Sequence, residues 1–419
     1  MTKYDTEPVI AVIGGGAAGC MAAAKAAECP GVRVIVFDRN EQPCRKISAS
    51  GNGRCNISNE YFPEDCYYSS GCFDREKRLQ HFPPQKLLSF FVSEGVYFHS
   101  RNGYLYPRTD QAATISSALL RILRDRGVVL RSSCGVSGLT REAAGGFLLR
   151  MQSGETVSAD RVVLASGGAA APQLGGTPDG YEFSRALGHR IISPIPALTS
   201  LVIRESTKAA SGVRAFAAVT LLESSQKPRV LRREEGELQI GNGVFSGIPV
   251  FQLSRLAGRA LEEGRKAALC VDFLPEFAPE TWERERARRL VLAAENRMLR
   301  ELTDGLVHPK ICALIAGHCG LTAENKTGRL SEKTLRQFLD RLRDDRYEIT
   351  GTGSFREAQV TAGGVCLEEI GEDFSSLCCP GLYLAGELLD VDGICGGYNL
   401  TFAMCSGAAA GMAAAASLG

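Results

Sequence analysis

Three glycines and one acid near the start of the chain have the types and spacing of a nucleotide-binding turn. Gly14, Gly16 and Gly19 satisfy the pattern G-x-G-x-x-G, and Asp38 follows about twenty residues later. In such a turn the first glycine permits a tight bend, the second lets the backbone approach a pyrophosphate, and the third lets a helix pack closely. The acid accepts hydrogen bonds from a ribose. The neighbouring residues included in this predicted dinucleotide site are Ala17, Ala18 and Arg39.

The elements that must position these residues are indicated by the same stretch. Residues 9–13 are an apolar, β-branched run typical of a buried strand, and the alanine-rich residues 20–28 have high helix propensity. Residues 32–38 form a second strand that ends in the acid. A helix that begins after the glycines presents free N–H groups and a partial positive charge to phosphates. Because strand, turn, helix, strand and acid follow in order, a ligand site is favoured over a plain glycine-rich turn.

A second cluster of polar and basic residues, KISASGNGRCNISN, spans residues 46–59. Its glycines free the backbone, and its Ser, Asn, Lys and Arg side chains supply hydrogen-bond donors. Such a loop can wrap a phosphate-bearing ligand. A surface turn is the alternative, but the density of small polar residues with interspersed basic ones favours a ligand-binding loop.

The two stretches GGGAAG and KISASGNGRCNISN resemble the N-terminal signatures of the BaiN/YhiN-like flavoproteins, also called the aminoacetone-oxidase-like family. The second stretch follows the family pattern K-I-x-x-S-G-x-G-R-C-N-x-[ST]-N throughout. The resemblance implies an FAD-dependent enzyme in which this loop lies along the pyrophosphate and the flavin ring. The residues it places next to the cofactor are Lys46, Ser50, Gly51, Arg54, Cys55 and Asn56. By analogy with related flavoproteins, the backbone of Val136 is expected to hold the adenine.

A later strand supports FAD as the cofactor. Residues 160–168, DRVVLASGG, form an apolar run that ends in paired glycines. They resemble the A-T-G-G signature of two-dinucleotide-fold flavoproteins, with Ser166 in place of threonine. We expect Ala165 and Gly167 to contact the cofactor. Because a plain NAD dehydrogenase does not need this strand, it favours FAD over NAD.

The C-terminal stretch GLYLAGELLDVDGICGGYNL, residues 381–400, is predicted to hold the flavin end of the cofactor. In related flavoproteins a strand of this kind presents an acid to the ribityl hydroxyls, which makes Gly386 and Glu387 candidates. The helix that follows would direct its positive end at the flavin N1–C2=O region and stabilise the reduced ring. Its candidate contacts are Gly397, Tyr398, Asn399 and Leu400. The catalytic candidates are Tyr398 or Asp392 as proton donor and Arg54, which would polarise a carbonyl or orient the flavin.

The pattern of the whole chain predicts an α/β fold with insertions. We expect a Rossmann-like FAD-binding domain of the two-dinucleotide-fold type in residues 1–193. Short strand-like pieces then indicate an inserted β-rich, barrel-like domain in residues 194–273, and a helical pattern indicates a small helical domain in residues 274–343. Residues 344–419 are expected to return by strands and complete the FAD-binding domain.

Composition excludes several classes of protein. The 419 residues carry a net charge of +1, which disfavours a nucleic-acid partner. No apolar run has the length of a membrane span, and the N-terminus shows no signal-peptide pattern, so we expect a cytoplasmic location and no membrane partner. The 15 cysteines include no C-x-x-C pair and the five histidines show no ligand spacing, so we predict no metal site. The oligomeric state is not indicated.

The reaction can be narrowed to flavin-dependent oxidoreduction. Because no second G-x-G-x-x-G follows a strand, NAD(P)H is expected to act as a transient electron donor rather than a resident cofactor. The resembled family is linked to reduction of conjugated double bonds in bile-acid intermediates and to amine oxidation. We favour an NAD(P)H-driven reductase of a conjugated C=C bond in a hydrophobic, bile-acid- or steroid-like enone. The alternatives are a flavin-dependent oxidase of an aminoacetone-like amine and a non-catalytic flavin-binding interaction protein.

Overall fold

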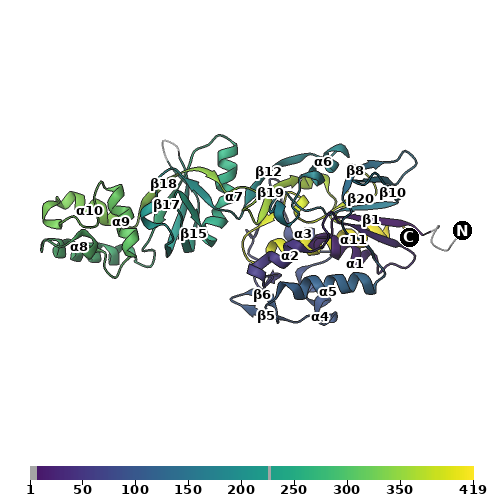
Figure 1. The fold of residues 1–419 in the computed structure, drawn as a ribbon, viewed down its shortest axis with the longest axis horizontal. Coiled ribbons are helices and arrows are strands. Elements are labelled where there is room, and N and C mark those ends of the chain that lie inside the picture. The colour runs from purple at the N-terminus through teal and green to yellow at the C-terminus, as the bar shows by residue number, and fades with distance from the viewer. Residues whose placement is uncertain (1–6, 225–227) are drawn as a thin grey trace. The chain divides into compact units, whose positions relative to one another are not determined.

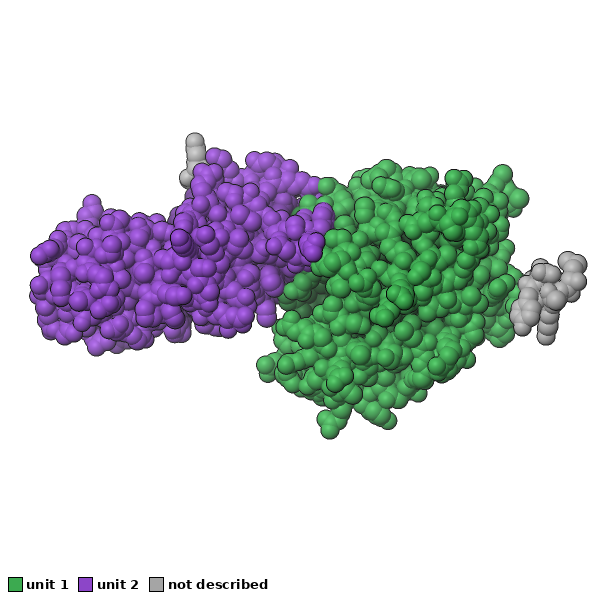
Figure 2. All heavy atoms as spheres, viewed as in Figure 1, with its two compact units in different colours: residues 1–195, 359–419 green, residues 196–358 purple. Residues whose placement is uncertain are grey.

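The computed structural model describes residues 7–224 and 228–419, which form two compact units coloured separately in Figure 2. The first unit combines Met1–Ile195 with Gln359–Gly419, and the second comprises Pro196–Ala358. The second unit is therefore an insertion in the chain of the first. No helix within residues 7–224 and 228–419 is long and apolar enough to cross a membrane.

The first unit is built on a five-stranded parallel sheet with the strand order β20-β11-β1-β2-β7. Its strands are β1 (Val9–Ile13), β2 (Arg33–Phe37), β7 (Val129–Arg131), β11 (Arg161–Leu164) and β20 (Leu382–Leu384). Two of these strands, β1 and β20, are labelled in Figure 1. Since all neighbouring pairs are parallel, the carboxyl ends of the strands meet at one edge, where ligands bind in folds of this kind. The glycine-motif strand β1 lies in the middle of the sheet, and the predicted Rossmann-like α/β fold is confirmed.

Helices α1 (Ala17–Ala26) and α11 (Tyr398–Ala416) pack against each other unusually closely. A Cβ atom on Gly407 would lie 2.1 Å from the carbonyl oxygen of Ala18, and one on Gly411 would lie 2.1 Å from that of Ala22. The two glycines are four residues apart and therefore lie on the same face of α11, which is the face in contact with α1. The first and the last helix of the described chain are thus interlocked through small residues.

The rest of the first unit surrounds this layer of sheet and helices. Its other helices are α2 (Arg45–Ala49), α3 (Arg75–Leu79), α4 (Pro84–Ser93), α5 (Ala112–Asp125) and α6 (Asp179–Ala186). A three-stranded antiparallel sheet contains β8 (Val136–Arg141), β9 (Phe147–Met151) and β10 (Thr156–Ala159), and another contains β3 (Ser58–Asn59), β5 (Phe98–Arg101) and β6 (Tyr104–Pro107). Two-stranded pairs join β4 (Tyr67–Tyr68) to β21 (Asp392–Gly393) and β12 (Ile191–Ala197) to β19 (Val360–Val365).

The second unit contains a closed barrel with the strand order β13-β16-β15-β14-β17-β18, which confirms the predicted barrel-like insertion. Its strands are β13 (Leu201–Ile203), β14 (Arg214–Glu223), β15 (Arg229–Ile240), β16 (Val244–Ser246), β17 (Ala267–Asp272) and β18 (Asp345–Thr352). Its helices are α7 (Ile248–Glu262), α8 (Pro279–Ala293), α9 (Pro309–His318) and α10 (Glu332–Arg341). The unit has its own apolar core, in which the rings of Phe245 and Tyr347 lie 4.7 Å apart.

The end of the insertion differs from the sequence expectation. Strand β18 pairs with β13 and β17 and closes the barrel, so residues 344–358 lie in the second unit and not with the returning FAD-binding part. The physical reason is the alternation of burial along β18, which turns Asp345, Tyr347 and Ile349 into the barrel. The other domain boundaries proposed from the sequence remain predictions.

Candidate functional site

The glycine turn after β1 has three different steric environments. Gly14 has φ +106°, and a Cβ there would lie 2.4 Å from the carbonyl oxygen of Ala165; a Cβ on Gly19 would lie 1.8 Å from the carbonyl oxygen of Gly14. A Cβ on Gly16 would meet nothing within 4 Å in the described chain. The first and last glycines are therefore required by packing, whereas the space at Gly16 is open to a ligand.

Helix α1 begins at this open position, and none of its own side chains neutralises its positive end. Its N-cap is Gly16, no side chain of the described residues caps it, and its first turn contains no acid. The first N–H groups of the helix therefore keep their capacity to bind an anion. Ala17 and Ala18, in the first turn, add no bulk beyond a methyl group.

Asp38 is fixed beside the turn at the end of β2. Its side chain is 7% exposed, and its Oδ2 accepts a hydrogen bond of 2.7 Å from the backbone N–H of Gly15. Its Oδ1 accepts from the backbone N–H of Asn40 at 2.7 Å and from the side-chain amide of Asn40 at 2.9 Å. Since each carboxylate oxygen can accept two bonds, Oδ2 retains capacity for a hydroxyl of a ribose.

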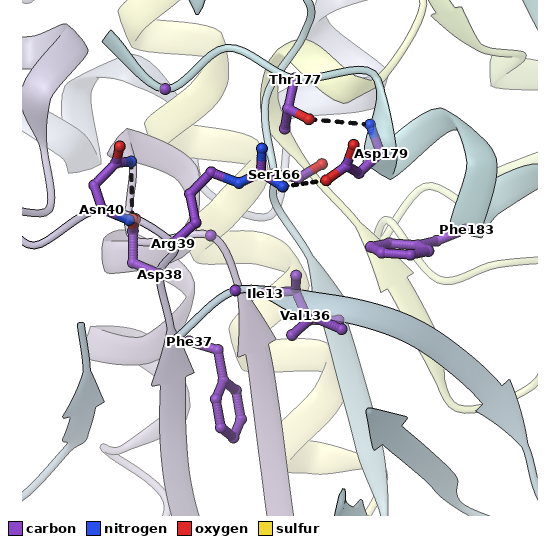
Figure 3. Close-up of a pocket in the computed structure, with 13 residues that line it drawn as sticks. Ile13, Phe37, Asp38, Arg39, Asn40, Val136, Ser166, Thr177, Asp179 and Phe183 are labelled. Carbon is purple, nitrogen blue, oxygen red and sulfur yellow. Dashed lines mark hydrogen bonds and ion pairs between the residues drawn. The ribbon is translucent and has the colours of Figure 1, made fainter. Parts of the chain in front are cut away.

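A crevice opens at the carboxyl ends of β1, β2 and β11 (Figure 3). Arg39 and Asp179 form an ion pair across it, and the backbone N–H of Asp179 donates to Oγ1 of Thr177 at 3.3 Å. The Oγ of Ser166 is buried and has no hydrogen-bond partner among the described residues. The lining residues are Ile13, Gly14, Phe37, Asp38, Arg39, Asn40, Gly135, Val136, Ser166, Gly175, Thr177, Asp179 and Phe183.

The structure thus brings Asp38, Arg39 and Val136 together, as a site for the adenosine part of a dinucleotide requires. Ala165 and Gly167 flank Ser166 in the segment that follows β11. Thr177 and Asp179 also line the crevice but were not predicted from the sequence. The stretch GTPDG carries no binding motif, and its only signal is the start of a helix.

The second signature loop is folded into a compact turn. Gly51, Asn52 and Gly53 all have positive φ, and the backbone N–H of Cys55 donates to the carbonyl of Ser50 at 3.0 Å. The Ser50 hydroxyl donates to the carbonyl of Ile47 at 2.7 Å. Burial raises the pKa of the Cys55 thiol to about 12, so it is not a reactive thiolate. The side chain of Arg54, which follows the turn, is exposed.

Lys46 connects this loop to the C-terminal strand. Its Nζ lies 2.8 Å from Oε2 of Glu387, and Oε1 of Glu387 accepts from the backbone N–H and the hydroxyl of Thr361, both at 3.1 Å. Oγ1 of Thr361 in turn accepts from the backbone N–H of Ala170 at 2.9 Å. Two segments that are distant in the sequence therefore hold the Glu387 carboxylate, and a third is linked to it through Thr361. Glu387 lies beside Gly386, which has φ +74°.

The same loop also reaches the start of the last helix. Gly397, the N-cap of α11, has φ +91°, and a Cβ there would lie 2.6 Å from the carbonyl oxygen of Ser58. With its amide oriented to satisfy both ends, Asn56 accepts from the backbone N–H of Gly397 at 3.2 Å and donates to the carbonyl of Ser58 at 2.8 Å. No side chain of the described residues caps α11 and no acid occupies its first turn, so it is a second free helix N-terminus.

The proposed catalytic side chains have distinct surroundings. The ring of Tyr398 is 4% exposed, its hydroxyl donates to the carbonyl of Tyr61 at 2.9 Å, and burial raises its pKa to about 12. Asp392 is buried in β21. The Asn399 side chain holds the backbone N–H and carbonyl of Gly393 at 2.8 Å each, and Leu400 is half-buried on α11. Their catalytic or cofactor roles remain predictions.

Three observations fit an extended dinucleotide with a flavin: the open space at Gly16, the unpartnered hydroxyl of Ser166 in the crevice, and two helix N-termini free of acids. Together with the sheet, they define a Rossmann-type flavoprotein, an oxidoreductase whose cofactor is FAD. The chain belongs to the HI0933-like family: the family described as "HI0933-like protein Rossmann domain" matches residues 8–413.

Relatives with assigned activities align over nearly the whole chain. The 3-dehydro-bile acid delta(4,6)-reductase of Clostridium scindens is 37% identical over 413 residues, which cover 97% of this chain and 98% of that protein. The ribosomal RNA dihydrouridine synthase of Escherichia coli is 28% identical over 413 residues, covering 97% and 96%. A solved 3-ketosteroid-delta4-(5alpha)-dehydrogenase from Rhodococcus jostii RHA1 aligns with a TM-score of 0.48 and 15% identity, over 99% of this chain and 98% of that chain.

Proposed function

We propose that this protein is an NAD(P)H-driven reductase that saturates a C=C bond conjugated with a carbonyl in a hydrophobic, bile-acid- or steroid-like enone. The observation that carries the proposal is the 37% identity, over 97% of the chain, to a bile acid delta(4,6)-reductase. A cytoplasmic location, where NAD(P)H is supplied, is part of the proposal.

The residues that would hold FAD follow from the site geometry. The N–H groups at the start of α1 would bind the pyrophosphate, with Gly16 leaving room for its approach. Asp38 would accept from the ribose hydroxyls, and Glu387, oriented by Lys46 and Thr361, would accept from the ribityl chain. The positive end of α11 would face the pyrimidine edge of the flavin. When bound, FAD supplies hydride transfer.

Two side chains are proposed to act on the substrate. Arg54 is exposed and makes no hydrogen bond or ion pair with the described residues, although its charge interacts with the Asp110 carboxylate, and it is proposed to polarise a substrate carbonyl. Tyr398 or Asp392 is proposed as the proton donor; Tyr398 keeps its proton at neutral pH because burial raises its pKa to about 12, and its hydroxyl donates to the carbonyl of Tyr61.

A second candidate substrate is uridine in ribosomal RNA. The observation in its favour is the 28% identity to a ribosomal RNA dihydrouridine synthase over 97% of the chain. Conversion of uridine to dihydrouridine also saturates a C=C bond next to a carbonyl, so both reactions would need the same arrangement of flavin, carbonyl polarisation and proton donor. The net charge of +1 favours the small hydrophobic substrate.

The decisive experiment is anaerobic mixing of the FAD-loaded protein with NADH or NADPH, followed by a 3-oxo-4,6-diene steroid. Loss of the flavin absorbance with the nicotinamide, its recovery with the steroid, and a product heavier by two hydrogens are expected. Flavin that neither nicotinamide reduces would refute the proposal. Recovery with unmodified ribosomal RNA but not with the steroid would assign the second substrate, and reduction by aminoacetone without nicotinamide would assign the amine oxidase.

A further inference from the structure

Three potential metal ligands from distant parts of the chain meet beyond the C-terminal end of α6. They are His189, Glu369 and Cys378, and one ligand atom from each lies within 4.8 Å of the other two. None of them lines the cofactor crevice. The cluster is therefore separate from the proposed FAD site.

The imidazole of His189 is the strongest indication that the cluster binds a ligand. The residue is 3% exposed, and its Nδ1 makes no hydrogen bond with any described residue although it faces Oε2 of Glu369 at 3.3 Å. A buried polar atom without a partner is costly. Two ligand atoms on one tetrahedral zinc, with bond lengths of about 2.0–2.1 Å, are separated by about 3.4 Å. The observed separation matches that value.

Neighbouring groups orient the three side chains, as outer-shell partners do in metal sites. Nε2 of His189 is hydrogen-bonded to Oγ of Ser376 at 2.8 Å, which leaves Nδ1 directed at the cluster. The same Oγ accepts from the backbone N–H of Cys378 at 3.1 Å. Oε2 of Glu369 accepts from the backbone N–H of Arg190 at 2.8 Å. One hydroxyl thus fixes two of the three ligand-bearing residues.

The charges of the three ligands match those of a binding site for a divalent cation. A histidine that ligates a metal does so through a neutral imidazole nitrogen, and Nδ1 of His189 is the nitrogen that faces the cluster. Cys378 is exposed, and as a metal ligand it would bind as a thiolate. One thiolate and one carboxylate neutralise a divalent ion. The guanidinium of Arg190 is already paired with Glu368 at 2.8 Å.

We infer that His189, Glu369 and Cys378 form a Zn²⁺ site that ties the end of α6 to the segment after β19. Zinc is the ion chosen because a nitrogen, an oxygen and a sulfur ligand suit it, and three protein ligands leave a fourth position for water. No metal site was predicted from the sequence, because the three ligands have no recognisable spacing along the chain. The site stabilises the fold and is not needed for reduction of the flavin.

The test is zinc binding by the full-length, FAD-loaded protein kept reduced with a non-thiol reductant. After chelator treatment, equilibrium dialysis against Zn²⁺ and elemental analysis are expected to give one zinc per chain. Cys378→Ser should weaken binding at least tenfold, and so should Glu369→Gln, which keeps an acceptor for the Arg190 N–H. Cys72→Ser, at an exposed thiol outside the cluster, is the matched control and should bind as the parent does.

Two further readouts separate a built site from loose binding. Co²⁺ should give ligand-field absorption at wavelengths longer than those of oxidised flavin, and Cys378→Ser should change it. Zinc should raise the thermal midpoint of the parent protein by several degrees and leave that of Cys378→Ser unchanged, with the flavin spectrum the same in both. Absence of stoichiometric zinc in the parent, or equal binding by Cys378→Ser, would overturn the inference and leave a His189–Glu369 pair.

Discussion

Gly16→Asp should make the FAD-free protein more stable while it abolishes cofactor binding. Gly16 is the N-cap of α1, with φ −83° and ψ −165°, which is the extended conformation that capping side chains adopt. A Cβ there meets nothing within 4 Å, so an aspartate fits without strain. Its carboxylate can accept from the first N–H groups of α1 and lies at the positive end of the helix, gains that together amount to about 0.5–1 kcal/mol.

The same carboxylate occupies the first N–H groups of α1, which a pyrophosphate would otherwise bind. A charged hydrogen bond is worth about 1.5–3 kcal/mol, and a second anion about 4 Å away adds repulsion of similar size. We therefore expect FAD affinity to fall by about 3 kcal/mol or more, which corresponds to over a hundredfold. The two effects have opposite signs, so a general loss of structure cannot imitate them.

The assay compares urea unfolding of the FAD-free proteins with FAD titration followed by flavin fluorescence. Gly19→Ala is the matched control in the same turn, because its Cβ would lie 1.8 Å from a backbone oxygen. It should lower the free energy of unfolding by about 1–3 kcal/mol. Wild-type FAD affinity in Gly16→Asp would refute the assignment of this turn to the pyrophosphate, and a loss of stability equal to that of the control would refute the steric argument.

Three further predictions concern packing, the ion pair and the buried thiol. Gly411→Ala should lower the free energy of unfolding by about 1–3 kcal/mol, because its Cβ would meet the backbone of α1. The control Gly317→Ala lies in open space on α9 and should be neutral or stabilise by up to about 1 kcal/mol. Equal effects of the two substitutions in urea unfolding would contradict this prediction. Lys46→Met should lower the free energy of unfolding by only about 1 kcal/mol in the parent, because the ion pair with Glu387 is partly exposed. The loss should be smaller in a Glu387→Gln background, where the pair is already broken, and additive losses in this double-mutant cycle would rule out the coupling. Cys55 should resist alkylation at pH 8 in the folded protein and react after unfolding, because burial raises its pKa to about 12; rapid labelling of Cys55 in the native state, detected by peptide mass spectrometry, would be inconsistent with the structure.

The parts of the site that depend on local pattern were predictable from the sequence. The run before Gly14 is apolar throughout and does not alternate between apolar and polar residues, a pattern typical of a central strand in a parallel sheet. In the structure, β1 is the central strand. Glycine spacing then placed the turn and the start of α1. The barrel was expected from short strand-like pieces, but its last strand, β18, was assigned to the wrong unit because pairing partners cannot be read from one strand.

Contacts between distant segments were not predictable from the sequence. Lys46 and Glu387 each carried a motif-based expectation, yet nothing in either motif showed that the two side chains form an ion pair 341 positions apart. The same holds for the approach of His189 to Glu369, since neither residue belongs to a motif. Such pairs arise from the strand order of the sheet and the return of the chain after the insertion, and these are global properties of the fold.

The close packing of the α11 glycines against α1 determines the order in which the two units can fold during translation. The second unit, Pro196–Ala358, carries its own core and can condense while translation continues. The first unit cannot, because α1 must wait for a partner helix that leaves the ribosome some four hundred residues later. The nucleotide-binding half of the protein is therefore completed late in synthesis, and a nascent chain arrested before α11 would expose the alanine-lined flank of α1 to water and to chaperones.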